Sequence, residues 1–244
     1  MKAVFRADSS NIIGSGHIIR CITLAKELRK KDVECIFVCR DHLNNISSKI
    51  LESEFELVLL PNMQDKYISN NNEINFDEWL GSSLVEDAQE TNEILKTLMP
   101  EWLIVDHYSI NKKWEDMTAK YTKFLMVIDD IADREHSCDI LLDQNFYLDK
   151  ENRYDGKVPK NCVKMLGPKY ALLQEDFIKI RDEIESNEIT NKTSINNVFI
   201  FFGGSDNFNL TELSLLALDK CFDQNVSIDI VLSSKNNNYA NIYE

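Results

Sequence analysis

The feature that most constrains this chain is a regular alternation of apolar segments with amphipathic ones. The segments at 4–7, 33–39, 55–60, 102–105 and 124–128 are expected to be strands, because their residues are mostly apolar. The segments between them carry apolar residues at spacings of three and four, which is typical of helices. Strands that are apolar on both faces belong to parallel sheets covered by helices on both sides. The sequence therefore predicts an α/β, Rossmann-like domain in the N-terminal part.

Three segments of the N-terminal part predict two individual helices and a loop. Residues 43–53 are expected to form a helix, and a second helix is expected from Ser82 to just before Pro100. Residues 61–75 are rich in asparagine and lack periodicity, which predicts a long loop. The residues alone leave open whether this loop closes over a ligand.

The pattern ends and then restarts near the C-terminus. A charged helix is expected near 174–185, and residues 186–197 are polar and unpatterned, which is typical of a linker. A strand, a glycine-rich turn, a helix and a strand then follow within 198–244, a unit of about 47 residues where a domain usually has 100 or more. We therefore expect a domain over 1–185 and the start of a second, incomplete Rossmann-like domain over 198–244.

The composition argues against several classes of protein. A formal net charge of −14 disfavours non-specific binding to nucleic acid, because the chain would repel the phosphates. The sequence contains neither an apolar run of roughly 20 residues, as a membrane-spanning helix needs, nor the pattern of a signal peptide. We therefore expect a cytoplasmic protein with no nucleic-acid or membrane partner.

The six cysteines predict no metal site and no disulfide scaffold. None forms a Cys-x-x-Cys pair, and none clusters with histidine at the spacing of metal ligands, so no metal and no cofactor are expected. Cys35 and Cys39 alternate with Phe37 along a predicted strand and are expected to be buried thiols.

Polar side chains follow the predicted strands at the point where each strand ends. Asp8 follows the first strand, Asp106 and Tyr108 follow the fourth, and Asp129 and Asp143 follow later ones. Ligands of open parallel sheets bind outside the carboxyl ends of the strands. The group predicts a binding site at that edge, although each position alone also fits an ordinary turn.

The sharpest motif is Gly14-Ser15-Gly16-His17, between the first strand and the first helix. The glycines let the backbone approach a phosphate, and the helix start offers N–H groups and a partial positive charge. The pattern is weak by itself and also fits a plain tight turn; it is neither the dinucleotide fingerprint nor a Walker loop. We expect His17 to be a neutral ring that can accept a proton, with Asp8 as a candidate to orient it.

A second glycine-rich turn, Gly203-Gly204-Ser205-Asp206, follows the first strand of the C-terminal unit. Two glycines leave the backbone without side chains at the edge of the sheet. The sheet edges that carry the two glycine-rich turns can face each other across a cleft. A turn without a ligand is the alternative.

In combination these motifs resemble the UDP-2,4-diacetamido-2,4,6-trideoxy-beta-L-altropyranose hydrolase family of pseudaminic acid biosynthesis. The similarity covers nearly the whole chain, and the combination is far more specific than any single motif. It is carried by residues 5–10, 13–17, 20–25, 105–108, 128–134, 138–145, 166–173 and 202–206.

The resemblance implies a fold like that of the GT-B glycosyltransferases, with the active cleft between two Rossmann-like domains. It implies a small-molecule UDP-sugar as substrate and water as acceptor, with His17 as the general base and Tyr108 at the reacting sugar. The second domain, of which we expect only the start in this chain, would hold the uridine and most of the diphosphate. The residues expected to bind the substrate are Arg6, Asp8, Ser9, Gly14, Ser15, Gly16, Asp106, Gly203, Gly204, Ser205 and Asp206.

Two other functions fit the same residues. A GT-B glycosyltransferase would use a UDP-sugar donor and transfer the sugar to an alcohol or amine. An inactive fragment that binds a nucleotide-sugar would keep the glycine-rich turns without turnover.

Overall fold

The chain folds into two compact units, Met1–Ile178 and Lys179–Glu244. The computed structural model describes residues 1–62, 79–186, 196–203, 206, 208–221, 226–232, 236 and 238–243. Most of the predicted loop at 61–75 and of the predicted linker at 186–197 lies outside the described residues. The predicted domain limits therefore stay predictions.

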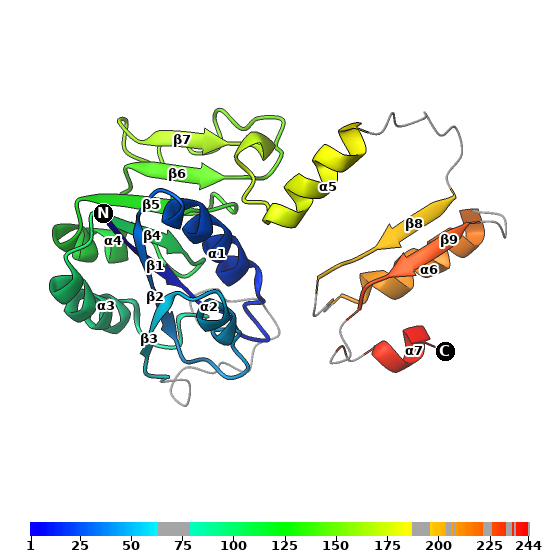
Figure 1. Cartoon of the computed structure of the whole chain (residues 1–244), viewed down its shortest axis with the longest axis horizontal. Coiled ribbons are helices and arrows are strands. Elements are labelled where there is room, and N and C mark those ends of the chain that lie inside the picture. The colour runs from blue at the N-terminus through cyan, green and yellow to red at the C-terminus, as the bar shows by residue number, and fades with distance from the viewer. Residues whose placement is uncertain are drawn as a thin grey trace. The chain divides into compact units, whose positions relative to one another are not determined.

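The N-terminal unit is built on a seven-stranded sheet with the order β3-β2-β1-β4-β5-β6-β7 (Figure 1). Every neighbouring pair of these strands is parallel. The strands are β1 Lys2–Ala7, β2 Glu34–Arg40, β3 Glu56–Leu60, β4 Trp102–Asp106, β5 Phe124–Ile128, β6 Ile140–Asp143 and β7 Val163–Leu166. The predicted α/β, Rossmann-like class with a parallel sheet is confirmed.

Helices pack on both faces of this sheet and bury a separate apolar cluster on each. On one face, Ala3 and Phe5 of β1 pack with residues of α1 and α2; on the other, Val4 packs with residues of α3 and α4 (Figure 1). Side chains alternate between the two faces of a strand, so consecutive residues of β1 enter different layers. The helices of this unit are α1 Gly16–Arg29, α2 Ser48–Glu52, α3 Leu84–Leu98, α4 Lys112–Thr118 and the first part of α5 Glu175–Ser186, with short 3-10 turns at Ala119–Tyr121 and Pro168–Tyr170.

The helix predicted at 43–53 is shorter in the structure, where α2 begins only at Ser48. Asn44 has a positive φ of 57°, and the Oδ1 atom of Asn45 accepts the N–H of Ser47 at 2.9 Å. Both features are typical of turns, because an asparagine side chain competes with the helix for backbone N–H groups.

Helix α3 begins and ends close to where the sequence predicts. Ser83 rather than Ser82 caps it, in a reciprocal pair with Glu86 in which each side chain accepts the other residue's backbone N–H. Met99 adopts a left-handed conformation with a φ of 46°, and the helix ends before Pro100 as expected.

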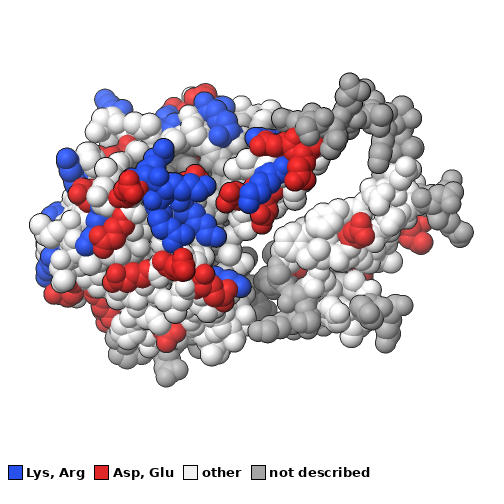
Figure 2. Space-filling view, viewed as in Figure 1, with Lys and Arg blue, Asp and Glu red and all other residues white. Residues whose placement is uncertain are grey.

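Basic side chains gather over α1 on the face of the N-terminal unit seen in Figure 2. Lys26 and Arg29 lie in the last turn of this helix, where the helix dipole favours positive charge. Within the described residues, no helix is both long and apolar enough to cross a membrane.

The C-terminal unit contains two parallel strands, β8 Asn197–Ile200 and β9 Ser227–Ile230. Helix α6 Leu210–Cys221 connects them, and a short helix, α7 Tyr239–Tyr243, follows. This is the strand–helix–strand unit that the sequence predicts.

A buried ionic network ties β1, β2 and α3 together. Arg6 donates to both carboxylate oxygens of Asp87, at 3.2 and 2.6 Å, and to Asp8 at 2.6 Å. Arg40 and the indole of Trp114 also donate to Asp87, at 2.8 and 2.9 Å. All five side chains are fully buried. Buried charges are tolerated only when paired, so this network fixes where α3 packs on the sheet.

Replacement of Asp87 by alanine is therefore expected to lower the free energy of unfolding by about 3–5 kcal/mol, because it leaves the guanidinium groups of Arg6 and Arg40 buried without that partner. Urea unfolding followed by circular dichroism measures this change. The matched control is Glu93→Ala on the same helix, whose side chain is 73% exposed and whose pair with Lys96 should contribute less than about 1 kcal/mol. Equal losses in the two variants would contradict the assignment.

Candidate functional site

The turn between β1 and α1 has the open backbone that its glycines suggest. Gly14 has a φ of +81°, and its N–H donates to the carbonyl of Ser10 at 2.8 Å. A Cβ atom built on Gly14 or Gly16 would meet no atom of the described residues within 4 Å. The predicted turn is thus confirmed, while its contact with a phosphate stays a prediction.

A cavity of about 500 Å³ lies beside this turn, inside the N-terminal unit. Its walls come from the turn itself, from His17 and Arg20 at the start of α1, from Tyr108 after β4, and from residues of the segment 172–177. The structure therefore brings together the two residues that the sequence marks for chemistry, His17 and Tyr108.

His17 is oriented by Asp106, at the end of β4. The Nδ1 atom of His17 lies 2.6 Å from Oδ1 of Asp106, and both side chains are buried. An ionised carboxylate can only accept hydrogen bonds, so Nδ1 carries the hydrogen and, in the neutral ring, Nε2 has the lone pair. The pair therefore presents Nε2 as a proton acceptor.

The expectation that Asp8 orients His17 is wrong, and the pleat of the sheet explains why. Asp106 is in register with Ala7 of β1, whose side chain packs in the same layer as α1. Asp8 comes one residue later and so faces the other layer, where its Oδ1 atom accepts from Arg6.

Arg20 fixes the carboxylate of Asp106 from the other side. Its Nε and Nη2 atoms donate to the two oxygens of Asp106, each at 2.6 Å, and Nη1 donates to Asp130 at 2.9 Å. Burial would raise the pKa of Asp106, but the contacts with His17 and Arg20 outweigh it and hold this pKa well below its usual range. Sequence reasoning missed Arg20, although its spacing of three from His17 places both on one face of the helix.

Tyr108 is held against His17 by its own hydrogen bond. The phenol donates to Asp130 at 2.6 Å, and the ring lies edge-on to the imidazole with centroids 4.6 Å apart. Burial and the hydrogen bond to Asp130 raise the pKa of Tyr108, so the phenol stays protonated near neutral pH. Trp79 packs on the tyrosine ring, with centroids 5.7 Å apart.

Three other predicted residues are buried and are not among those that line the cavity. Arg6 and Asp8 are fully buried and belong to the network with Asp87. Ser9 is 3% exposed, and its hydroxyl accepts the N–H of Ile46 at 2.9 Å. Contact of these side chains with a substrate stays a prediction that their burial does not support.

The second glycine-rich turn is described in part. Gly203 has a φ of +78°, and the carboxylate of Asp206 accepts the backbone N–H groups of Leu210 and Thr211 at 2.8 and 3.0 Å. Asp206 thus caps the start of α6. Gly204 and Ser205 lie outside the described residues, and the predicted substrate contacts of all four residues stay predictions.

The backbone that carries Asp130 is fixed by the segment between β6 and β7. The carbonyl of Asp130 accepts from Arg153 at 2.6 Å and from the hydroxyl of Tyr147 at 3.0 Å. The Tyr154 hydroxyl lies within hydrogen-bond distance of Asp129 and Asp143, at 3.1 and 3.0 Å from a carboxylate oxygen of each. The contacts of Arg153 and Tyr147 hold the backbone of Asp130, whose carboxylate accepts hydrogen bonds from both Arg20 and Tyr108.

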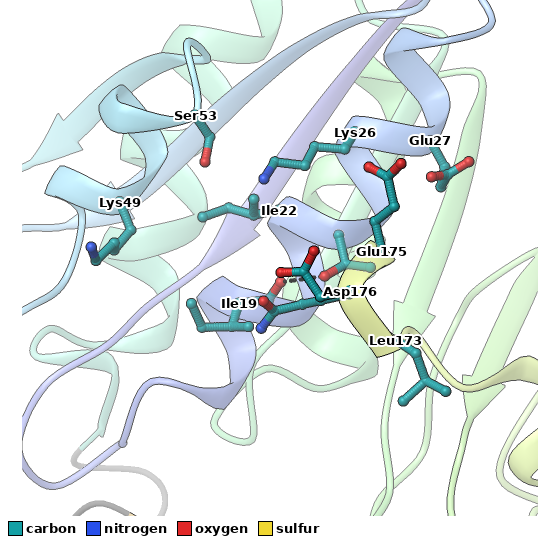
Figure 3. Close-up of a pocket in the computed structure, with 11 residues that line it drawn as sticks. Ile19, Ile22, Lys26, Glu27, Lys49, Ser53, Leu173, Glu175 and Asp176 are labelled. Carbon is teal, nitrogen blue, oxygen red and sulfur yellow. Dashed lines mark hydrogen bonds between the residues drawn. The ribbon is translucent and has the colours of Figure 1, made fainter. Parts of the chain in front are cut away.

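A second cavity, of about 260 Å³, shares Ile19, Leu173 and Gln174 with the first (Figure 3). Lys26, Lys49, Glu175 and Asp176 contribute to its walls, so its charges are mixed. His17 and Tyr108 line the larger cavity and not this one, which makes the larger cavity the candidate site. Among the residues that the structure describes, no group of three or more His, Cys, Asp or Glu side chains could hold a metal ion.

The fold and the site define an α/β, Rossmann-like protein with a buried histidine–aspartate pair at the carboxyl edge of a parallel sheet. Over 238 residues the chain is 31% identical to the UDP-2,4-diacetamido-2,4,6-trideoxy-beta-L-altropyranose hydrolase of Campylobacter jejuni. The match covers 98% of this chain and 72% of that protein. The chain belongs to the family of this hydrolase. It is also 27% identical over 230 residues to an uncharacterized protein of Methanocaldococcus jannaschii, and the match covers 93% of this chain and 42% of that protein. No model of a known protein family matches the chain.

Replacement of Asp106 by asparagine is expected to release the His17 ring. An amide cannot accept all the hydrogen bonds that the carboxylate accepts from His17 and Arg20, and its NH₂ group opposes one of these donors. We expect the nitrogen chemical shifts of His17 to change from an Nδ1–H pattern to a mixture of tautomers, as measured by long-range ¹H–¹⁵N correlation spectra. The control is Asp130→Asn, which leaves the contact between Asp106 and His17 in place. An unchanged Nδ1–H pattern in the Asp106 variant would contradict this geometry.

A second prediction concerns His136, whose Nδ1 atom lies 2.7 Å from Glu115 and whose Nε2 atom lies 3.9 Å from Asp129. Burial lowers its pKa, but the contacts with Asp129 and Glu115 outweigh burial and raise the pKa to about 9. Because the folded-state pKa exceeds the unfolded value near 6.5, this stabilisation is complete below about pH 6.5 and is lost as the pH rises through 9. We expect the free energy of unfolding to fall by up to about 3 kcal/mol over this window. The same measurement on His136→Gln should give a much smaller fall; an equal fall would contradict the assignment.

Proposed function

We propose that this chain hydrolyses a UDP-linked 2,4-diacetamido-2,4,6-trideoxy sugar to UDP and the free sugar, as a step of pseudaminic acid biosynthesis. The observation that carries the proposal is the His17–Asp106 pair at the wall of the larger cavity. The relative from Campylobacter jejuni, which is named as a hydrolase of such a UDP-sugar, supports the substrate class.

In the proposed reaction, Nε2 of His17 accepts a proton from water as the water oxygen attacks the anomeric carbon of the sugar. The bond between that carbon and the diphosphate oxygen breaks, and UDP leaves with the bonding electron pair. Asp106 stabilises the imidazolium that forms and keeps the ring in the productive tautomer, as the aspartate does in other carboxylate–histidine pairs. Arg20 keeps the Asp106 carboxylate ionised and in place.

The leaving diphosphate needs partners for its negative charge, because the chain as a whole is acidic. The open backbone at Gly14 and Gly16, at the start of the 14-residue helix α1, is suited to receive a phosphate oxygen. In a GT-B-like arrangement, which we also propose, the turn at Gly203–Asp206 would begin the part that holds the uridine.

The proposal is tested by incubating the full chain with the UDP-diacetamido sugar in ¹⁸O-labelled water, with no added alcohol or amine. We expect UDP to be released without ¹⁸O in its phosphates, because water attacks carbon rather than phosphorus. His17→Ala should reduce the rate of UDP release by about 10²–10⁴-fold while its affinity for the UDP-sugar changes little. Lys26→Ala on the same helix, in the wall of the smaller cavity, serves as the control and should keep the wild-type rate.

Each alternative gives a different result. Release of UDP only after an alcohol or amine is added would indicate a glycosyltransferase. Binding of the UDP-sugar without release of UDP would indicate a binding fragment. A rate unchanged by His17→Ala would exclude this histidine as the base.

A further inference from the structure

Two cysteines outside the candidate site lie side by side where two neighbouring strands begin. Cys138 comes shortly before β6 and Cys162 directly before β7, and their sulfur atoms are 3.7 Å apart. The parallel pairing of Ile140 with Val163, and the hydrogen bond of 2.8 Å from the Val163 N–H to the carbonyl of Asp139, fix this approach. The two thiols are therefore held together by the backbone of the sheet.

The two sulfurs differ in their surroundings. Cys138 is 3% exposed, whereas Cys162 is partly exposed. The hydrogen bond between the two thiols lowers the pKa of Cys162, while this bond and burial raise the pKa of Cys138. The accessible sulfur is therefore the one that more readily becomes a thiolate, which is the reactive form of cysteine.

We propose that Cys138 and Cys162 form a reversible redox site that reacts with hydrogen peroxide and closes into a disulfide. The thiolate of Cys162 attacks one oxygen of the peroxide, the O–O bond breaks, and Cys162 becomes a sulfenic acid as hydroxide leaves. The sulfur of Cys138 then attacks the sulfenic sulfur, loses its proton and displaces the hydroxyl group as water. The two thiols lose two electrons and two protons in total, and the peroxide is reduced to two molecules of water.

The disulfide would act on the segment that it closes. This segment contains Tyr147 and Arg153, which hold the carbonyl of Asp130 at the edge of the candidate site. Closing a loop of about 24 residues restricts the unfolded chain and opposes local opening of the segment. Oxidation should therefore make the N-terminal unit harder to unfold, independently of whether the chain is a hydrolase.

The experiment uses the full chain with Cys221→Ser, because Cys221 is exposed and would otherwise be oxidised as well. After treatment with hydrogen peroxide, we expect a mass loss of about 2 Da, reversed by dithiothreitol, and one cross-linked peptide that contains Cys138 and Cys162. The thermal midpoint should rise by about 5 °C or more in the oxidised form. In the same background, Cys138→Ala should show no such rise and should leave Cys162 as a sulfenic or sulfinic acid.

Two results would overturn the proposal. One is full alkylation of both cysteines in the unfolded chain after exposure to peroxide, since it shows that neither thiol had reacted. The other is a sulfinic acid at Cys162 with Cys138 still open to alkylation in the chain that retains both thiols. Cys162→Ser, at the partly exposed position, provides a folded variant in which the cross-linked peptide must be missing.

Discussion

The candidate site depends on the buried carboxylate of Asp106. This group lies at the end of β4, next to β1, and accepts hydrogen bonds from His17 and from two nitrogens of Arg20. Burying a carboxylate costs free energy unless its oxygens accept hydrogen bonds. His17 and Arg20 offset this cost only in the positions from which they can donate to Asp106. The tautomer of His17, the position of Arg20 and the start of α1 against the sheet therefore follow from one charge.

Two further sets of charged side chains keep this arrangement rigid. On one side, Asp87 of α3 pairs with Arg6 and fixes the end of β1. On the other, Arg153 fixes the backbone of Asp130, the residue that joins Arg20 to Tyr108. An acidic chain thus places its buried arginines between carboxylates, so that each of these guanidinium groups is paired. Preorganised charges of this kind suit a reaction in which charge develops, because little reorganisation is needed.

The sequence was sufficient for the parallel sheet and for the glycine-rich turn, since both follow from local patterns. It was not sufficient for the partner of His17. Asp8 is closer to His17 in the sequence, but Asp106 reaches it because β4 pairs with β1 and Ala7 is in register with Asp106. Strand order is a long-range property that no local pattern reveals. The alternation of side chains between the two faces of β1 can nevertheless be read from the sequence. It places Asp8 on the face opposite Phe5 and α1.

The hydrogen bond of Tyr108 limits what this residue can offer to a sugar. Its hydroxyl group donates a hydrogen bond of 2.6 Å to Asp130, and the raised pKa of Tyr108 keeps the phenol protonated near neutral pH. A phenol that donates its proton to Asp130 does not donate the same proton to a substrate. The ring of Tyr108 instead packs edge-on against the imidazole of His17, with centroids 4.6 Å apart, and so helps to hold that ring in place.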